Sequence, residues 1–359
     1  MECPGAQSRS CLSRFLNRAI FQSKQVFLAP KEPLKIAVIG GGHIAQQHLP
    51  VLRDLPEAAL VSLVERQPQV LQETADRFAI PQRFSSHLEL FERDRPDAVF
   101  VLVSVLQVAQ VAADCIRAGV PTFMEKPPGL YTEQTRELAE LARRHQTPTM
   151  VGVNRRFYST LLKGRQQLLE SGPIRSVAVE VHEDISRLRT DPRSAAKFPE
   201  EVVQRWSAAN SVHGLDLLRF FGGDISRIET LHRTVEGPVP DCCTAVMEFA
   251  AGGVGRALMD WFAPGAYRFQ VRSAGATLNG EHGFYTVQLQ RRGAAEMVLE
   301  RDELDQQYKA GFYRQDQAFL QSVRDGAKAP FPACDLEDAV KTMEMVDAVA
   351  GFQGPGSRL

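Results

Sequence analysis

The chain has 359 residues, of which 44% are hydrophobic and 24% are charged, and its formal net charge is -1. This composition is typical of a soluble globular protein with one large or two smaller domains, and it excludes a disordered chain. Because the sequence has neither a run of like charges nor an apolar segment long enough to cross a bilayer, neither nucleic acid nor a membrane is expected as its main partner.

Residues 1–32 differ in composition from the rest and are expected to form an N-terminal extension. No acidic residue lies between Glu2 and Glu32, whereas five basic residues do, and apolar residues recur there at helical spacing. Such a segment is compatible with an organellar targeting helix. A packing arm and a misplaced start codon are the alternatives. We expect a cytoplasmic protein unless this segment directs it elsewhere.

The six cysteines are expected to be reduced thiols. None forms a C-x-x-C pair, and the adjacent Cys242 and Cys243 suit a buried strand better than a disulfide framework. The histidines lack the spacing of a zinc site, and His182, Glu183 and Asp184 alternate between the two faces of a predicted strand. No metal is therefore expected.

From residue 34 onward, short apolar runs alternate with segments of helical periodicity. The predicted strands cover 34–40, 59–66, 97–104, 121–127 and 147–153, and helices are predicted after the first strand, at 111–119 and at 132–145. Strands that alternate with helices of this length predict a doubly wound parallel sheet, which is the Rossmann arrangement. We assign residues 33–153 to this first domain.

Beyond residue 154 the pattern becomes rich in strands. The runs at 174–184, 227–235, 242–250, 253–262 and 267–275 predict a mostly antiparallel sheet that is open on one face. Helices are predicted at 210–223, with Asn210 and Ser211 as caps and two glycines as the stop, and at 315–324 and 336–350. We assign 154–359 to a second α/β domain, whose open sheet face favours a homo-oligomer, either a dimer or a tetramer.

The turn after the first strand fits the dinucleotide-binding pattern G-x-G-x-x-A. Gly40 allows a tight turn, Gly42 lets the backbone approach a pyrophosphate, and the small Ala45 lets the helix and strand pack closely. His43 and Ile44 lie between these positions and are expected at the same site.

An acidic residue ends the second predicted strand, 20 residues after Ala45. This residue, Glu65, is expected to bind the ribose hydroxyls of the nucleotide. Arg66 follows it and can pair with a 2′-phosphate or stack on adenine. The cofactor is therefore NAD or NADP, and NAD is favoured because the charge of Glu65 disfavours a 2′-phosphate.

The chain also contains KIAVIGGGHIAQQHLPVL at 35–52, RAGVPTFMEKP at 117–127, VGVNRRF at 151–157 and VHGLDLLRFFGG at 212–223. With these motifs, the sequence from residue 34 onward resembles the glucose–fructose oxidoreductase, inositol dehydrogenase and MocA family of NAD(P)-dependent oxidoreductases. The E-K-P tripeptide downstream of the glycine turn makes this resemblance specific. It implies a Rossmann domain followed by an α/β domain with an open antiparallel sheet, and an active site between them.

The resemblance also implies roles for individual residues. Lys126 of E-K-P and His213 of H-x-x-D would act on the reacting hydroxyl or carbonyl, with His213 as the base and Lys126 stabilising alkoxide charge. Ser104, Glu125 and Lys126 would lie beside the cofactor. Two further residues match positions that line the cleft. These are Asn154 and Arg156, and Arg156 would bind substrate hydroxyls or a carboxylate, or else pair with an acid of the protein.

Two departures from the family pattern concern this site. Ala209 stands where the family usually has an aspartate that orients the histidine, so Asn210 or Asp216, both expected at the substrate site, are the candidate partners of His213. Val103, Ser104 and Val108 replace the usual T-P-x-x-x-H, which makes the predicted pocket more apolar.

The function expected from these features is hydride transfer between NAD(P) and a small polyhydroxy substrate. The reaction would interconvert a secondary alcohol and a ketone on a sugar, a cyclitol or a related compound. Two alternatives remain open. One is a nucleotide-binding sensor or corepressor that has kept the fold and lost catalysis, and the other is a reductase of a less polar ketone or imine.

Overall fold

The computed structural model describes residues 32–352, and it describes side chains throughout this range except at 195–197. The predicted targeting segment therefore lies outside the described residues, as do Cys3 and Cys11. In the described range, four cysteines are free thiols: Cys115, Cys242, Cys243 and Cys334. No helix in this range is both long and apolar enough to cross a membrane.

The first sheet is parallel and has six strands in the order β3-β2-β1-β4-β5-β6. Helices connect the strands. The strand order reverses direction between β1 and β4, as in a doubly wound fold. The predicted fold class is confirmed. The strands are β1 (Leu34–Ile39), β2 (Ala58–Val64), β3 (Gln82–Phe84), β4 (Ala98–Val101), β5 (Thr122–Glu125) and β6 (Thr149–Gly152). The helices are α1 (Ala45–Asp54), α2 (Pro68–Arg77), α3 (His87–Arg93), α4 (Val105–Arg117) and α5 (Thr132–His145).

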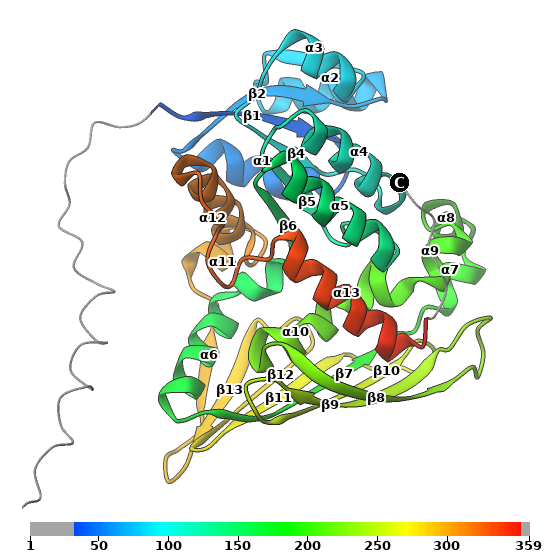
Figure 1. The fold of residues 1–359 in the computed structure, drawn as a ribbon, viewed down its shortest axis with the longest axis vertical. Helices are drawn as coiled ribbons and strands as arrows, with labels where there is room; N and C mark the ends of the chain where they lie inside the picture. Colours follow the sequence, from blue (N-terminus) through cyan, green and yellow to red (C-terminus); the bar gives the residue numbers. More distant parts are fainter. Residues whose placement is uncertain (1–31, 353–359) are drawn as a thin grey trace, which may run out of the picture. The chain divides into compact units, whose positions relative to one another are not determined.

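The second sheet has eight strands in the order β14-β13-β12-β11-β7-β10-β9-β8. Its neighbours pair antiparallel except for β7 and β10, which are parallel. Figure 1 shows helices α6 (Ser159–Glu170) and α10 (Val212–Gly222) on one face of this sheet. The strands are β7 (Ile174–His182), β8 (Ile225–Arg233), β9 (Cys242–Phe249), β10 (Val254–Asp260), β11 (Tyr267–Ser273), β12 (Ala276–Glu281), β13 (Thr286–Arg291) and β14 (Met297–Glu300).

Buried and partly exposed side chains alternate along the strands, which explains why one face of this sheet is covered. In β7, Val177, Val179 and Val181 are buried, whereas the residues between them are only partly buried. Because successive side chains of a strand point to opposite faces, the valines share the face that packs on α10. The opposite face carries exposed side chains, including Val246 and Val254.

Helix α10 begins differently from the sequence prediction. The chain enters it through a π-helical segment, Ser207–Ser211, and neither Asn210 nor Ser211 caps the helix with its side chain. Both side chains instead donate hydrogen bonds to Glu183, so the predicted caps are wrong. The predicted end is confirmed, since α10 stops at Gly222 and is followed by Gly223 at a φ of +84°.

Two helices from the end of the chain complete the core of the first sheet. Phe312 and Phe319 of α12 (Phe312–Asp325) belong to the same buried cluster as Val38 of β1. Leu336 of α13 (Leu336–Ala350) belongs to the cluster on the other face of that sheet, and α13 also packs against α10 and β8. The proposed domain boundary at residue 153 stays a prediction. The remaining short helices are Asn154–Phe157, α7 (Ser186–Thr190), α8 (Pro192–Lys197), α9 (Glu200–Gln204) and α11 (Glu303–Gln307).

Candidate active site

The glycine turn between β1 and α1 provides a nucleotide cradle. Gly40 has a φ of +105°, and a Cβ atom added there would lie 2.5 Å from the carbonyl oxygen of Leu102, so the position accepts only glycine. A Cβ atom at Gly42 would meet no protein atom within 4 Å. Gly42 and His43 are exposed, whereas Ala45 is buried at the start of α1. The turn therefore leaves open space where the helix N-terminus favours an anionic group.

Glu65 is held at the carboxyl end of β2, beside the glycine turn. Its two carboxylate oxygens each accept a bond of 2.9 Å, one from the backbone amide of Gly41 and one from that of Gln67. Each oxygen keeps a lone pair for a further donor, such as a ribose hydroxyl. The open glycine cradle and the fixed carboxylate together fit a dinucleotide. Arg66 and Ser104 lie near them, and both contact the side-chain amide of Gln107, at 3.3 and 3.0 Å.

A buried histidine lies on α1, the helix that follows this turn, and no motif in the sequence pointed to it. The imidazole of His48 is fully buried, with Nδ1 2.8 Å from Asp316 and Nε2 3.2 Å from Glu125. Burial alone lowers the pKa of His48, but the two carboxylates outweigh it and raise this pKa to about 9. An imidazolium therefore bridges α1, the end of β5 and α12. Glu125, expected beside the cofactor, is 8% exposed and is bound from this side.

Lys126 follows β5 directly and points to the middle of the π-helical segment. Its Nζ donates a bond of 2.8 Å to the carbonyl oxygen of Ala209. Burial lowers the pKa of Lys126 to about 8; Glu125 and Glu183 oppose this effect, while Arg155 and Lys309 add to it. The amine therefore changes its charge within the range in which proton transfer at neutral pH is efficient.

His213 lies in the first turn of α10, close to Lys126. Burial lowers the pKa of His213 well below 6.5, and the charges of Lys126, Arg155 and Lys309 lower it further. The imidazole is therefore neutral at pH 7. Among the hydrogen bonds found within residues 32–352, none joins His213 to another side chain. In particular, among these hydrogen bonds neither Asn210 nor Asp216 is a partner of its ring.

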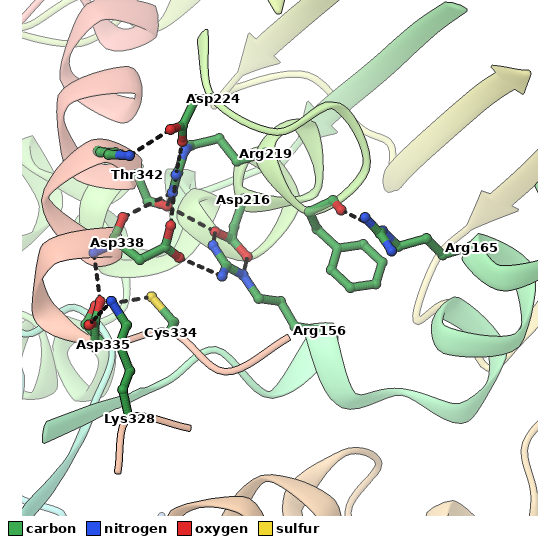
Figure 2. Close-up of polar contacts among 12 residues, drawn as sticks. Arg156, Arg165, Asp216, Arg219, Asp224, Lys328, Cys334, Asp335, Asp338 and Thr342 are labelled. Atoms are coloured by element: carbon green, nitrogen blue, oxygen red, sulfur yellow. Dashed lines mark hydrogen bonds and ion pairs between the residues drawn. The ribbon is translucent and has the colours of Figure 1, made fainter. Parts of the chain in front are cut away.

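Asp216, one of those two candidates, belongs to a buried ion cluster. Figure 2 shows its carboxylate facing the guanidinium of Arg156, with bonds of 2.7 and 2.6 Å from Nε and Nη2. Arg156 also donates a 2.6 Å bond to Asp338, and Thr342 donates one of 3.0 Å to Asp216. Arg156 and Asp216 are each 2% exposed. Of the two roles considered for Arg156, the observed contacts are those of structural pairing with an acid.

Asn154, the other residue predicted from the N-R-R-F motif, is also occupied within the protein. It is 5% exposed, and its Nδ2 donates a 3.0 Å bond to the carbonyl oxygen of Ala310. Arg155 lies between Asn154 and Arg156 in the sequence. After burial, its charge contributes to lowering the pKa of both Lys126 and His213. The motif therefore reaches the site through Arg155, which was not among the predicted site residues.

Glu183 is a second site residue that was not predicted. It follows β7 and accepts bonds from Asn210 and, at 2.6 Å, from the hydroxyl of Ser211. Asn210 also lies 3.2 Å from the hydroxyl of Tyr267, and Trp261 donates a 3.2 Å bond to Ser211. The signal in the sequence was the acidic H-E-D run, which was considered only as a metal site.

The two valines of the altered motif differ in burial. Val103 is half-buried just after β4, and Val108 is buried within α4. Val108 belongs to the buried cluster that also contains Leu336, and Val103 packs against this cluster, so the more apolar pocket stays a prediction.

Comparison with known proteins places these features in a family. Residues 34–153 match an oxidoreductase family with an NAD-binding Rossmann fold, and residues 207–351 match the C-terminal α/β domain of the same family. The trans-1,2-dihydrobenzene-1,2-diol dehydrogenase of Mus musculus is 26% identical over 159 residues, which are 43% of this chain and 48% of that protein. The D-apiose dehydrogenase of Rhizobium rhizogenes is 23% identical over 222 residues, which are 61% of this chain and 63% of that protein.

The matched segments thus span about half to two thirds of these relatives' own length. A solved structure covers more of the chain. The crystal structure of a dehydrogenase from Chromobacterium violaceum superposes with a TM-score of 0.76 at 17% identity, over 89% of this chain and 95% of that one. This likeness concerns the fold. Since the two family matches together cover more than half of the sequence, the chain belongs to the glucose–fructose oxidoreductase, inositol dehydrogenase and MocA family of oxidoreductases.

Proposed function

We propose that the chain is an NAD-dependent dehydrogenase that interconverts a secondary alcohol and a ketone on a sugar, a cyclitol or a related polyhydroxy compound. One observation carries the proposal. Lys126, with its pKa lowered to about 8, lies beside the neutral His213 at the carboxyl edge of the parallel sheet. Ligands of doubly wound folds bind at this edge. The names of two relatives, which denote enzymes of a cyclic diol and of a sugar, agree with this substrate class.

In this proposal Lys126 moves the proton. When bound, the dinucleotide supplies the hydride acceptor or donor. Oxidation of an alcohol also requires loss of the hydroxyl proton, and the free amine of Lys126 accepts it most efficiently when its pKa is near the working pH. The carbonyl of Ala209 holds the ammonium nitrogen at 2.8 Å and so fixes its position.

His213 has a different task from the one that the family resemblance implies. Its pKa is strongly lowered, and within residues 32–352 no carboxylate hydrogen-bonds to its ring, so it is a poor base. As a neutral imidazole it can still hydrogen-bond the substrate oxygen and orient the hydroxyl toward Lys126. The missing aspartate at position 209 is therefore compatible with catalysis by the lysine.

The proposed preference for NAD rests on Glu65. Two backbone amides fix its carboxylate beside the glycine turn, so a 2′-phosphate would meet a negative charge that cannot turn away. Glu65→Gln removes the charge and keeps the shape. We expect this change to lower the ratio of NADH to NADPH affinity by about tenfold, or 1.4 kcal/mol. Tighter binding of NADPH than of NADH by the unmodified chain would contradict the proposal.

The activity is tested with the full chain and a panel of polyols and keto sugars, by following the absorbance of NADH. Lys126→Met should lower kcat/KM by roughly 10²- to 10⁴-fold. Lys163→Met is the matched control, because Lys163 is exposed on α6. The chain is the nucleotide-binding sensor rather than an enzyme if three results are found together: NADH binds, no compound of the panel turns over, and Lys126→Met leaves any residual change in NADH absorbance as it was.

The open face of the second sheet is proposed as a contact surface between copies of the chain. Leu231, Val246 and Val254 are each more than half exposed. Since apolar side chains gathered on a sheet face tend to be covered, we expect a homo-oligomer. Light scattering after size exclusion measures its mass, and a monomer at micromolar concentration would contradict this expectation.

A further inference from the structure

Three cationic side chains, Lys126, Arg155 and Lys309, interact electrostatically near His213. Arg155 and Lys309 each lower the pKa of both Lys126 and His213. Within residues 32–352, no acidic side chain forms an ion pair within 4.0 Å with any of the three cations. The two acids that act on Lys126 are bound elsewhere, Glu125 by His48 and Glu183 by side chains at the start of α10. The group therefore has an excess of positive charge.

Arg155 is held in place but lacks one hydrogen bond. Its guanidinium carbon lies 4.5 Å from the ring centroid of Tyr267 and 5.2 Å from that of Phe284. The nitrogen Nη1 is buried, and it has no hydrogen-bond partner in the part of the chain that the structure describes. Leaving a buried donor unpaired is unfavourable, especially on a charged group. An acceptor from outside the protein would satisfy it.

Lys309 is brought beside Arg155 by a close approach of two backbone segments. Asn154 donates a 3.0 Å bond to the carbonyl oxygen of Ala310. A Cβ atom at Gly311 would lie 2.1 Å from the carbonyl oxygen of Asn154, so the segments touch. The residues next to this contact, Arg155 and Lys309, present their charges to the same region, and Arg155 contributes, after burial, to lowering the pKa of Lys309.

We infer that the substrate carries a carboxylate, which Arg155 binds through Nη1 with Lys309 beside it, while Lys126 and His213 face the alcohol carbon. This inference rests on the proposed function and narrows its substrate class to hydroxy acids, such as sugar acids and cyclitol acids. A carboxylate is a monoanion that matches one free guanidinium donor and one ammonium group. A phosphate monoester needs more donors, such as the run of backbone amides at a helix N-terminus.

The experiment measures binding and turnover separately, with matched pairs of compounds. Isothermal titration calorimetry on the full chain saturated with NADH gives the affinity for glucuronate against glucose, for quinate against myo-inositol, and for glucose 6-phosphate. The same compounds are then assayed for turnover with the matching redox state of the cofactor. We expect the acid of at least one pair to bind about tenfold or more tightly than its neutral partner and than the phosphate.

Variants identify the residues responsible. Arg155→Met and Lys309→Met should each weaken binding of the acid by roughly 10- to 100-fold, which is far more than either weakens binding of the neutral partner. Arg155→Lys should recover part of the loss, since it restores the charge without the planar fork. Arg165→Met is the control. Its guanidinium also stacks on aromatic rings, at 4.3 Å from Phe331, and donates to the carbonyl oxygen of Phe220 in the region drawn in Figure 2.

The outcomes separate this inference from the function on which it rests. Three results would overturn the carboxylate inference. The first is equal affinity for acids and their neutral partners, and the second is tighter binding of the phosphate. The third is acid binding that is unchanged in both Arg155→Met and Lys309→Met, although Lys309 is exposed. Turnover of a neutral polyol in that case would leave the proposed dehydrogenase intact. Selective acid binding that depends on Arg155, without turnover of any compound, would support the binding site and overturn the enzymatic function.

Discussion

Replacing Asp216 by asparagine separates a structural role of this carboxylate from a role as the partner of His213. Asp216 is 2% exposed and receives two bonds, of 2.7 and 2.6 Å, from Arg156. Breaking a buried ion pair costs about 3–5 kcal/mol because one charge is left uncompensated. Arg156 keeps its 2.6 Å bond to Asp338 in this variant. We therefore expect the free energy of unfolding to fall by an amount at the lower end of that range, about 3 kcal/mol.

Urea unfolding followed by circular dichroism measures this loss. The midpoint of the transition should fall while its slope stays constant, because the surface exposed on unfolding does not change. Asp224→Asn is the control within the same cluster. The Asp224 side chain is 50% exposed and pairs with Arg219 and Lys341, so its loss should cost at most about 1 kcal/mol.

Activity measured below the unfolding transition completes the test. If Asp216 is structural, the folded Asp216→Asn protein retains a kcat/KM close to that of the unmodified chain. A variant that unfolds at the same urea concentration as the unmodified chain and has lost its activity would refute the reasoning. It would make Asp216 the partner of His213.

Three further predictions follow from the site. For alcohol oxidation, kcat/KM should rise with pH and level off above about 8, where Lys126 loses its proton; Lys126→Arg should remove this rise, and a profile that keeps it would exclude the lysine. Gly42→Ala should weaken NADH binding in a fluorescence titration without lowering Tm, because its Cβ atom meets no protein atom within 4 Å, whereas Gly40→Ala should lower Tm through its clash with Leu102. The pKa of His48 is raised from 6.5 to about 9, so its charge contributes up to about 3 kcal/mol of stability below pH 6.5, lost as pH rises through 9. The difference in unfolding free energy between the unmodified chain and His48→Gln should follow this curve, and a flat difference would contradict it.

The sequence predicted the parts of the molecule that depend on local patterns. Alternating apolar periods predicted the parallel sheet and the mostly antiparallel sheet, both of which are confirmed. The glycine turn and Glu65 could be read together because their spacing is fixed by one strand–helix–strand unit. Lys126 and His213 entered through a family resemblance, and their catalytic roles stay predictions.

What the sequence could not predict depends on partners far away in the chain. Arg155 and Arg156 are neighbours, yet one faces the site and the other pairs with an aspartate 182 residues later. No local pattern distinguishes them, because their short helical turn has no clear apolar face. Asn210 and Ser211 have the residue types of helix caps, but Glu183, after β7, takes their hydrogen bonds. A tertiary contact there outweighed a local preference.

The bridge formed by His48 also has a consequence for the order in which this protein can fold. As the ribosome makes the chain, His48 of α1 appears 268 residues before Asp316, its carboxylate partner on α12. Until then the first sheet also lacks Phe312 and Phe319, which complete one side of its core. The cofactor-binding half is made first, yet one side of its core is completed only after all the strands of the second sheet have been made, so its glycine turn gains this support late.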